Sequence, residues 1–273
     1  MSTPKFDIEE KKEVTEAMLR MREVEPRILN QNLHCSHVSG RVLSVPEDYD
    51  FTLLHEGESP KSFVDSVLAL LREGRFIGID CTPQHYLNKA WENYKVLSYI
   101  DVNSTDGKTA LNVGGGSCLI NAYLASKGIA VSSVDKCERS AFLIDNENEI
   151  AKKLSLDLRA IDCDFLNWEE GRLFDYVFSI CVIEHLSTRE MQAEFVRGMA
   201  KRVRPGGFFL LTFGYGPKGT TNPYLNEEDV ATHICGYLDD FEIVEPFSFS
   251  GLWTISEGHT WGFLAARRKP EVH

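Results

Sequence analysis

The chain has 273 residues, of which 43% are hydrophobic, so it can bury a sizeable core as one large domain or as a core with an appendage. Its formal net charge is −12 and its pI is near 5.2. This balance counts against a nucleic-acid binder, since neutralising phosphates requires a basic surface. No window approaches the roughly 18–20 apolar residues of a membrane span, and the first residues do not have the pattern of a signal peptide.

The first hundred residues predict helices separated by turn-rich stretches. Ile8 to about Glu25 predicts a charged amphipathic helix that ends at Pro26. A second helix is expected from Pro60 to Arg72, followed by a short strand at Arg75–Ile79. The aromatic-rich stretch from Tyr86 to Ile100 predicts a further helix.

The most informative segment is LNVGGGSC, Leu111 to Cys118, which predicts a short strand followed by a glycine turn. A helix is expected next, over residues 117–127, and then a strand, Ala130 to Val134, that ends at Asp135. A strand, a glycine turn, a helix and a strand ending in an acid form a βαβ unit, in which the acid can accept two hydrogen bonds from a ribose.

Dinucleotide enzymes share this layout, but their glycine fingerprint is incomplete here. Counted from Gly114, the pattern G-x-G-x-x-G requires a third glycine at the position of Leu119. An NAD-dependent oxidoreductase on a similar sheet therefore stays as an alternative, although no downstream Tyr-x-x-x-Lys pair supports it.

Further motifs follow at regular distances in the second half of the chain. They are DCDF at residues 162–165, FDYVFSICVIEHL at 174–186 and VRPGGFFLLTF at 203–213. The first follows a predicted strand at 158–161, and a helix is expected between the other two, from about Thr188 to Val203. Together with LNVGGGSC and Asp135, this ordered set resembles the class I S-adenosylmethionine (SAM) dependent methyltransferase family, over roughly Trp91 to Arg268.

The resemblance implies an α/β fold with a seven-stranded, mostly parallel sheet flanked by helices. The last strands would be residues 240–244 and 260–266, after a helix from Asn226 to about Cys235, with the final strand inserted antiparallel. Residues 91–273 would form the SAM-binding core. Residues 1–90 would form an N-terminal helical cap over the cofactor and the acceptor, with a separate interaction module as the alternative.

The resemblance also implies which residues bind the cofactor. The backbone of the glycine turn would pass beneath SAM, Asp135 would bind the ribose, and Asp164 would lie at the adenine edge. Asn112 occupies a position where the family usually has an acid, so it can form hydrogen bonds but supplies no charge. The full predicted set is Trp91, Tyr94, Asn112, Gly114, Gly115, Gly116, Asp135, Cys163, Asp164, Phe165, Ser179 and Ile180.

The candidates for a general base are histidines. His185 follows the fourth predicted strand, and histidine is the residue type best suited to proton transfer near neutrality. His233 and His259 lie in the C-terminal region, from which acceptor contacts often come. We predict no metal, because Glu184 and His185 stand alone, and because His34, Cys35 and His37 have no fourth partner with zinc-ligand spacing.

The sequence thus predicts a SAM-dependent methyltransferase that acts on an oxygen or nitrogen atom of a small molecule, in a biosynthetic pathway. A catalytically inactive SAM-binding regulatory subunit is the rival from another class. Neither nucleic acid nor membrane is an expected partner, and the oligomeric state is left open, with a homodimer as one option. Seven cysteines without CxxC spacing predict free thiols and a cytoplasmic location.

Overall fold

A computed structural model describes residues 92–93, 95–102, 104–115, 119–136, 141–215, 227–249 and 260–271. The expected helices and strand before residue 86, and the His34, Cys35 and His37 group, lie outside the described residues. The boundary expected near residue 90 therefore stays a prediction.

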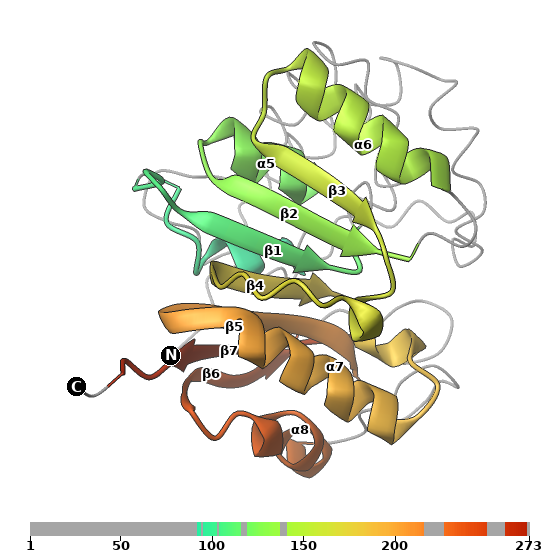
Figure 1. Ribbon diagram of the computed structural model, residues 1–273. Coiled ribbons are helices and arrows are strands. Elements are labelled where there is room, and N and C mark those ends of the chain that lie inside the picture. Colours follow the sequence, from blue (N-terminus) through green and yellow to red (C-terminus); the bar gives the residue numbers. More distant parts are fainter. Residues whose placement is uncertain are drawn as a thin grey trace, which may run out of the picture.

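The described chain is built on a seven-stranded sheet with the order β3-β2-β1-β4-β5-β7-β6 (Figure 1). The first five strands of this order are parallel, whereas β7 is antiparallel to both β5 and β6. This confirms the predicted fold class, including the antiparallel insertion. The strands are β1 Thr109–Val113, β2 Ala130–Asp135, β3 Leu158–Asp162, β4 Phe174–Ile180, β5 Val203–Tyr215, β6 Phe241–Phe249 and β7 Thr260–Arg268.

Helices cover both faces of the sheet. They are α5 Leu119–Ser126, α6 Ala141–Lys153, α7 Arg189–Arg202 and α8 Glu227–His233, with short 3₁₀ turns η2 Phe165–Asn167, η3 Ile183–His185 and η4 Cys235–Tyr237. Alternate residues of a strand point to opposite faces. In β1, Val113 joins the core cluster under α7, while its neighbour Asn112 bonds Asn121 of α5. The helices α5 and α7 therefore lie on opposite faces.

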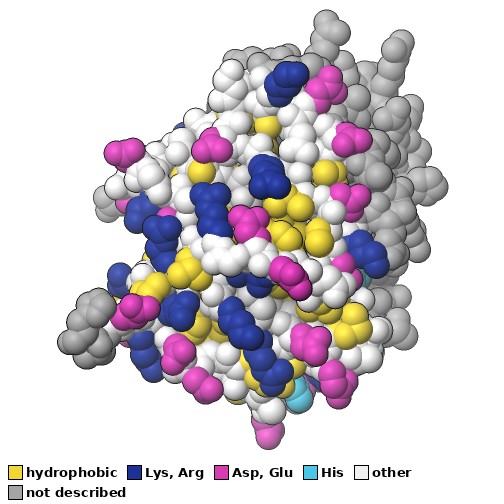
Figure 2. All heavy atoms as spheres, viewed as in Figure 1, with side chains coloured by type: hydrophobic (Ala, Val, Ile, Leu, Met, Phe, Trp, Pro, Cys, Tyr) yellow, Lys and Arg dark blue, Asp and Glu magenta, His cyan; other side chains and the backbone are white. Residues whose placement is uncertain are grey.

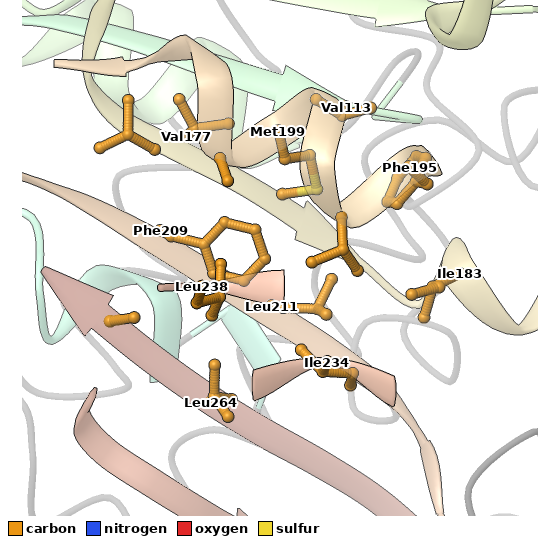
Figure 3. Packing of buried hydrophobic residues seen from close by; sticks show 14 of the residues in the cluster. Val113, Val177, Ile183, Phe195, Met199, Phe209, Leu211, Ile234, Leu238 and Leu264 are labelled. Carbon is orange, nitrogen blue, oxygen red and sulfur yellow. The ribbon is translucent and has the colours of Figure 1, made fainter. Parts of the chain in front are cut away.

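The larger core lies between the sheet and the helices α7 and α8. Figure 3 shows Phe209 and Leu211 of β5 facing Met199 of α7, with Leu238 close by. Each of these side chains is at most 3% exposed. Burying a side chain of this size contributes about 1.5–3 kcal/mol, so this cluster is a principal source of the fold's stability.

The opposite face carries the helical segment that contains residues 92–93 and 95–97. Just beyond it, Tyr99 packs its ring against Phe208 of β5 and Phe263 of β7. The hydroxyl of Tyr99 donates a hydrogen bond of 2.8 Å to Glu245 Oε2, and Lys95 pairs with Glu245 Oε1 at 2.9 Å. Burial, followed by the Glu245 carboxylate, raises the pKa of the Tyr99 hydroxyl. These contacts fix the segment to strands more than 100 residues away.

Two local features differ from the sequence predictions. The strand β5 begins at Val203, directly after α7, so Arg204-Pro-Gly-Gly207, which was expected only to end the helix, belongs to the strand. A register shift opposite Phe174 and Tyr176 accommodates the glycines. The helix α6 was not predicted, because its stretch AFLIDNENEIAKK mixes polar and apolar residues. The predicted helix start at Thr188 is confirmed, since its hydroxyl caps α7 by accepting from Met191 N–H.

Figure 2 shows acidic and basic side chains interspersed over the face of the molecule that carries α7. Within the described ranges, no helix is both long enough and apolar enough to cross a bilayer.

Candidate active site

The glycine turn follows β1 at the carboxyl edge of the sheet, to which the arrowheads of β1, β2 and β3 point (Figure 1). Gly114 has φ +75°, a left-handed conformation that favours glycine, and its N–H donates to the carbonyl of Val134 at 2.8 Å. A Cβ at Gly114 would lie 2.5 Å from Val182 Cγ2, and one at Gly115 would lie 2.0 Å from Asn112 Nδ2. Both glycines are thus required by neighbours within the chain.

A buried polar network lies behind this turn. Asn112 Nδ2 donates to Asn121 Oδ1 at 2.8 Å, and Asn121 Nδ2 donates to Glu147 Oε1 at 2.8 Å and to the carbonyl of Gly115 at 2.9 Å. These three side chains are at most 1% exposed. The network ties the turn to both α5 and α6, so it holds the backbone of the turn in one shape. Asn121 and Glu147 were not singled out in the sequence, because their role depends on the packing of two helices.

Two acids lie at the ends of β2 and β3, as the sequence predicts. Asp135 is the last residue of β2, is partly exposed, and its carbonyl accepts from Cys163 N–H at 3.0 Å. Asp164 caps η2, since its Oδ1 accepts from Leu166 N–H at 3.0 Å, and its Oδ2 lies 3.9 Å from Lys136 Nζ. One oxygen of Asp164 is therefore used to shape its own loop.

The loop after β3 packs against the guanidinium of Arg202, which lies between two aromatic rings. The guanidinium of Arg202 lies 4.8 Å from the ring centres of both Phe165 and Trp168. It donates to the carbonyls of Gly198, at 3.0 Å, and Trp168. Burial lowers the pKa of Arg202. The predicted adenine-edge residue Phe165 is 7% exposed, so it supports the loop with most of its ring inside the core.

The end of β4 is tied to its two neighbouring strands. Ser179 Oγ donates to the carbonyl of Val113 at 2.7 Å, which fixes β4 against the end of β1. Ile180 pairs in register with Thr212 of β5. The next residue, Cys181, has φ +51°, and its N–H donates to Thr212 Oγ1 at 3.1 Å. The backbone at the predicted positions Ser179 and Ile180 therefore lies between the glycine turn and β5.

A carboxylate from far away in the sequence reaches this strand end. Glu92 is 0% exposed, and its Oε1 accepts hydrogen bonds from Cys181 Sγ and, at 3.3 Å, from Thr212 Oγ1. Glu92 was not among the predicted site residues, although its neighbours Trp91 and Tyr94 were. The sequence shows only an acidic residue within an aromatic-rich helix. An acidic residue on the solvent-facing side of a helix would look the same in the sequence.

The structure separates the candidate histidines. His185 is exposed on η3, and His233 lies at the end of α8, where its Nε2 is 3.6 Å from Asp229 Oδ1. His259, Trp91, Tyr94 and Gly116 lie outside the described residues. Among the residues that are described, no group of three His, Cys, Asp or Glu side chains could hold a metal ion.

Residues 111–211 match the family model described as a methyltransferase domain. The chain contains a methyltransferase domain. S-adenosylmethionine is the cofactor of this family, and the seven-stranded sheet with an antiparallel final strand is the one that the family resemblance predicted.

The curated relatives share one name, and each aligns with only part of this chain. The ubiquinone biosynthesis O-methyltransferase of Rhizobium etli is 31% identical over 39% of this chain and 41% of its own length. The protein of the same name from Pseudomonas paraeruginosa is 26% identical over 56% of this chain and 64% of its own length. The chain thus spans less than two thirds of the length of each of these relatives.

Solved structures agree on the fold of the methyltransferase domain. The TehB protein of Haemophilus influenzae is 20% identical, with a TM-score of 0.50 over 64% of this chain and 61% of that one. The [4+2]-cyclase SpnF has a TM-score of 0.54 at 12% identity, over 69% of this chain and 83% of that one. Since SpnF is named for a different reaction, the fold alone does not define the chemistry.

The residues of the methyltransferase domain fit SAM. Within the described part of the chain, Asn112 Oδ1 is a buried acceptor without a hydrogen-bond donor, and it lies directly beneath Gly115. The ammonium group of the methionine part of SAM is a hydrogen-bond donor of this kind. The carboxylate of Asp135 stands at the end of the neighbouring strand, where the family resemblance predicts a ribose ligand.

Proposed function

We propose that this chain is a SAM-dependent methyltransferase that methylates an oxygen or nitrogen atom of a small molecule. The observation that carries the proposal is the glycine turn of a methyltransferase domain with Asp135 and Asp164 on the next two strands of the sheet. The printed names of the curated relatives favour a hydroxyl group as the acceptor.

The proposed roles are those that the family resemblance implies for these residues. Asp135 accepts hydrogen bonds from the ribose, and Asp164 Oδ2 faces the adenine edge while Oδ1 holds η2. Cys163 and Phe165 contribute the backbone of that loop. Asn112, with Gly114, Gly115 and Gly116, supports the methionine part, together with the backbone of Ser179 and Ile180. Trp91 and Tyr94 remain proposed cofactor contacts next to Glu92.

SAM, when bound, supplies a methyl group that is already activated by a sulfonium. The protein therefore needs no covalent nucleophile; it must align the acceptor and exclude water. Glu92 and the ends of β4 and β5 do this in our proposal, since Glu92, Ser179 and Thr212 are all 0% exposed. The histidines His185, His233 and His259 remain predictions as general bases.

A panel of small-molecule acceptors with methyl-labelled SAM tests the activity. It should contain phenols, catechols, carboxylates and primary amines, and methyl transfer to one class is the expected result. If S-adenosylhomocysteine binds but no member of a broad panel is methylated, the regulatory-subunit alternative replaces the enzyme. The cytoplasmic location and a homodimer are finer parts of the proposal, which cell fractionation and light scattering test.

A further inference from the structure

A compact group of polar side chains lies beside the cofactor residues without belonging to them. It consists of Glu92, Cys181 and Thr212, which we call the Glu92 cluster. The thiol of Cys181 and the hydroxyl of Thr212 both donate to Glu92 Oε1, while the same hydroxyl accepts from Cys181 N–H at 3.1 Å. Glu92 and Thr212 are 0% exposed. One carboxylate oxygen is thereby held in place by the residue that follows β4 and by a residue of β5.

The order of the strands places this cluster on the acceptor side of the methyltransferase domain. Asp135 and Asp164 mark the nucleoside end, on β2 and directly after β3. Neighbouring strands lie about 4.8 Å apart, so a ligand that extends from β2 across β1 reaches the end of β4 after about 10 Å. Thr212 lies one strand further, on β5. The cluster therefore stands where a methyl group would leave the cofactor.

The Glu92 cluster also contains an unusual backbone conformation, at Cys181. Cys181 has φ +51°, and in the described ranges it shares a positive φ with only one other non-glycine residue, Ser155. Such conformations cost energy for a residue with a Cβ, and they concentrate at functional sites. Here the conformation directs the Cys181 thiol at Glu92 while the Cys181 N–H bonds β5.

We propose, on the basis of the proposed function, that Glu92 is the proton acceptor of the methyl transfer and that Cys181 and Thr212 are its positioning residues. A lone pair of the acceptor atom forms the new bond to the methyl carbon. The carbon–sulfur bond breaks, and its electron pair stays on sulfur. The proton of the acceptor O–H or N–H passes to the Glu92 carboxylate and then to solvent. The substrate class is therefore a hydroxyl compound or a primary or secondary amine, each of which must lose a proton, and a tertiary amine or a thioether is excluded.

Calorimetric titration of the full chain with two cofactor analogues tests the proposal without any acceptor. S-adenosylhomocysteine lacks the methyl group, whereas sinefungin carries an amine where the methyl group would be. In Glu92→Gln, the affinity for sinefungin should fall roughly 10- to 100-fold, because a charge-assisted hydrogen bond is lost. The affinity for S-adenosylhomocysteine should stay within about threefold.

Glu245→Gln is the matched control, since Glu245 also contacts this segment, through Lys95, but belongs to β6. It should leave both affinities unchanged. If Glu92→Gln weakens both analogues equally or neither, the inference is overturned while the proposed function stands. If the unaltered protein binds neither analogue, the proposed function itself fails.

A second variant covers the case in which Glu92→Gln does not fold. Thr212→Val removes one donor to the carboxylate and keeps the charge. A loss of about three- to tenfold for sinefungin alone supports the proposal, because the carboxylate is then less well oriented. An equal effect on both analogues, or no effect on either, overturns it.

Discussion

The two sides of the carboxyl edge are built in different ways. On the β1–β2–β3 side, the glycine turn, Asp135 and Asp164 come from one stretch of chain, and the acids are partly exposed. On the β4–β5 side, Glu92 meets Cys181 and Thr212 across 89 and 120 positions of sequence, and its carboxylate is buried. The first side is thus local and open to a polar ligand, whereas the second is assembled only by folding.

The largest expected effect is at the glycine turn. Gly114→Ala should lower the free energy of unfolding by about 2–5 kcal/mol, from the positive φ and from overlap with Val182. Gly107→Ala is the matched control, because Gly107 has φ +67° but open space around its Cβ position. Urea denaturation measures both variants. Equal losses would show that packing against Val182 does not require the glycine.

Asp135→Ala should weaken S-adenosylhomocysteine by about 1.5–3 kcal/mol, because it deletes charge-assisted hydrogen bonds to the ribose. Asp162 pairs with Asp135 in register and is exposed, so Asp162→Ala should change the affinity by less than about 0.5 kcal/mol. Calorimetry on both variants decides the point. Unchanged affinity in a folded Asp135→Ala variant would contradict the assignment of Asp135 as the ribose ligand.

Asp175, at the amino end of β4, gives a prediction about pH and stability rather than ligand binding. Burial raises its pKa, but hydrogen bonds from the Thr109 N–H and hydroxyl, with Arg204 and Lys108 nearby, outweigh burial and lower the pKa from 3.8. Folding therefore favours the ionised form, and its stabilisation is present above the ordinary carboxyl range and lost as the pH falls through it.

Asp175→Asn should accordingly cost about 1–3 kcal/mol of unfolding free energy at neutral pH and much less near pH 3. Denaturation curves at several pH values provide the measurement. The affinity for S-adenosylhomocysteine should not change, because Asp175 lies at the edge opposite the glycine turn. A pH-independent difference would contradict the assigned cause.

The smallest effect is expected at His185. Because we assign the proton to Glu92 and because His185 is exposed, His185→Ala should lower turnover of the best panel acceptor by less than about tenfold. Steady-state rates with labelled SAM measure this. A loss of 10²–10⁴, the usual cost of removing a general base, would return the role to His185.

The sequence predicted the local side of the edge well. A strand, a glycine turn and a strand-end acid each depend on neighbours within a few residues, so β1, β2 and Asp135 could be placed. The same holds for the start of α7 at Thr188. The helix α7 ends at Arg202, close to the predicted end near Val203, and the stretch 204–207 that follows is skipped by the register of β4, which pairs Phe174 with Val203 and Tyr176 with Phe208.

The assembled side could not be predicted from local patterns. Nothing near Glu92 in the chain indicates that its carboxylate meets the ends of β4 and β5, and Cys181 and Thr212 lie within stretches that look like ordinary strand ends. The same limit applies to Asn121 and Glu147, whose hydrogen bonds depend on how α5 and α6 pack. Such groups become visible only when the topology is known.

Calorimetric titration of the unaltered chain with S-adenosylhomocysteine, and in parallel with NAD, tests the central claim most directly. The account predicts saturable binding of S-adenosylhomocysteine and no measurable heat with NAD, because the third glycine of the dinucleotide fingerprint is replaced by Leu119. Binding of NAD without S-adenosylhomocysteine, or binding of neither, would contradict the assignment of a SAM-dependent methyltransferase.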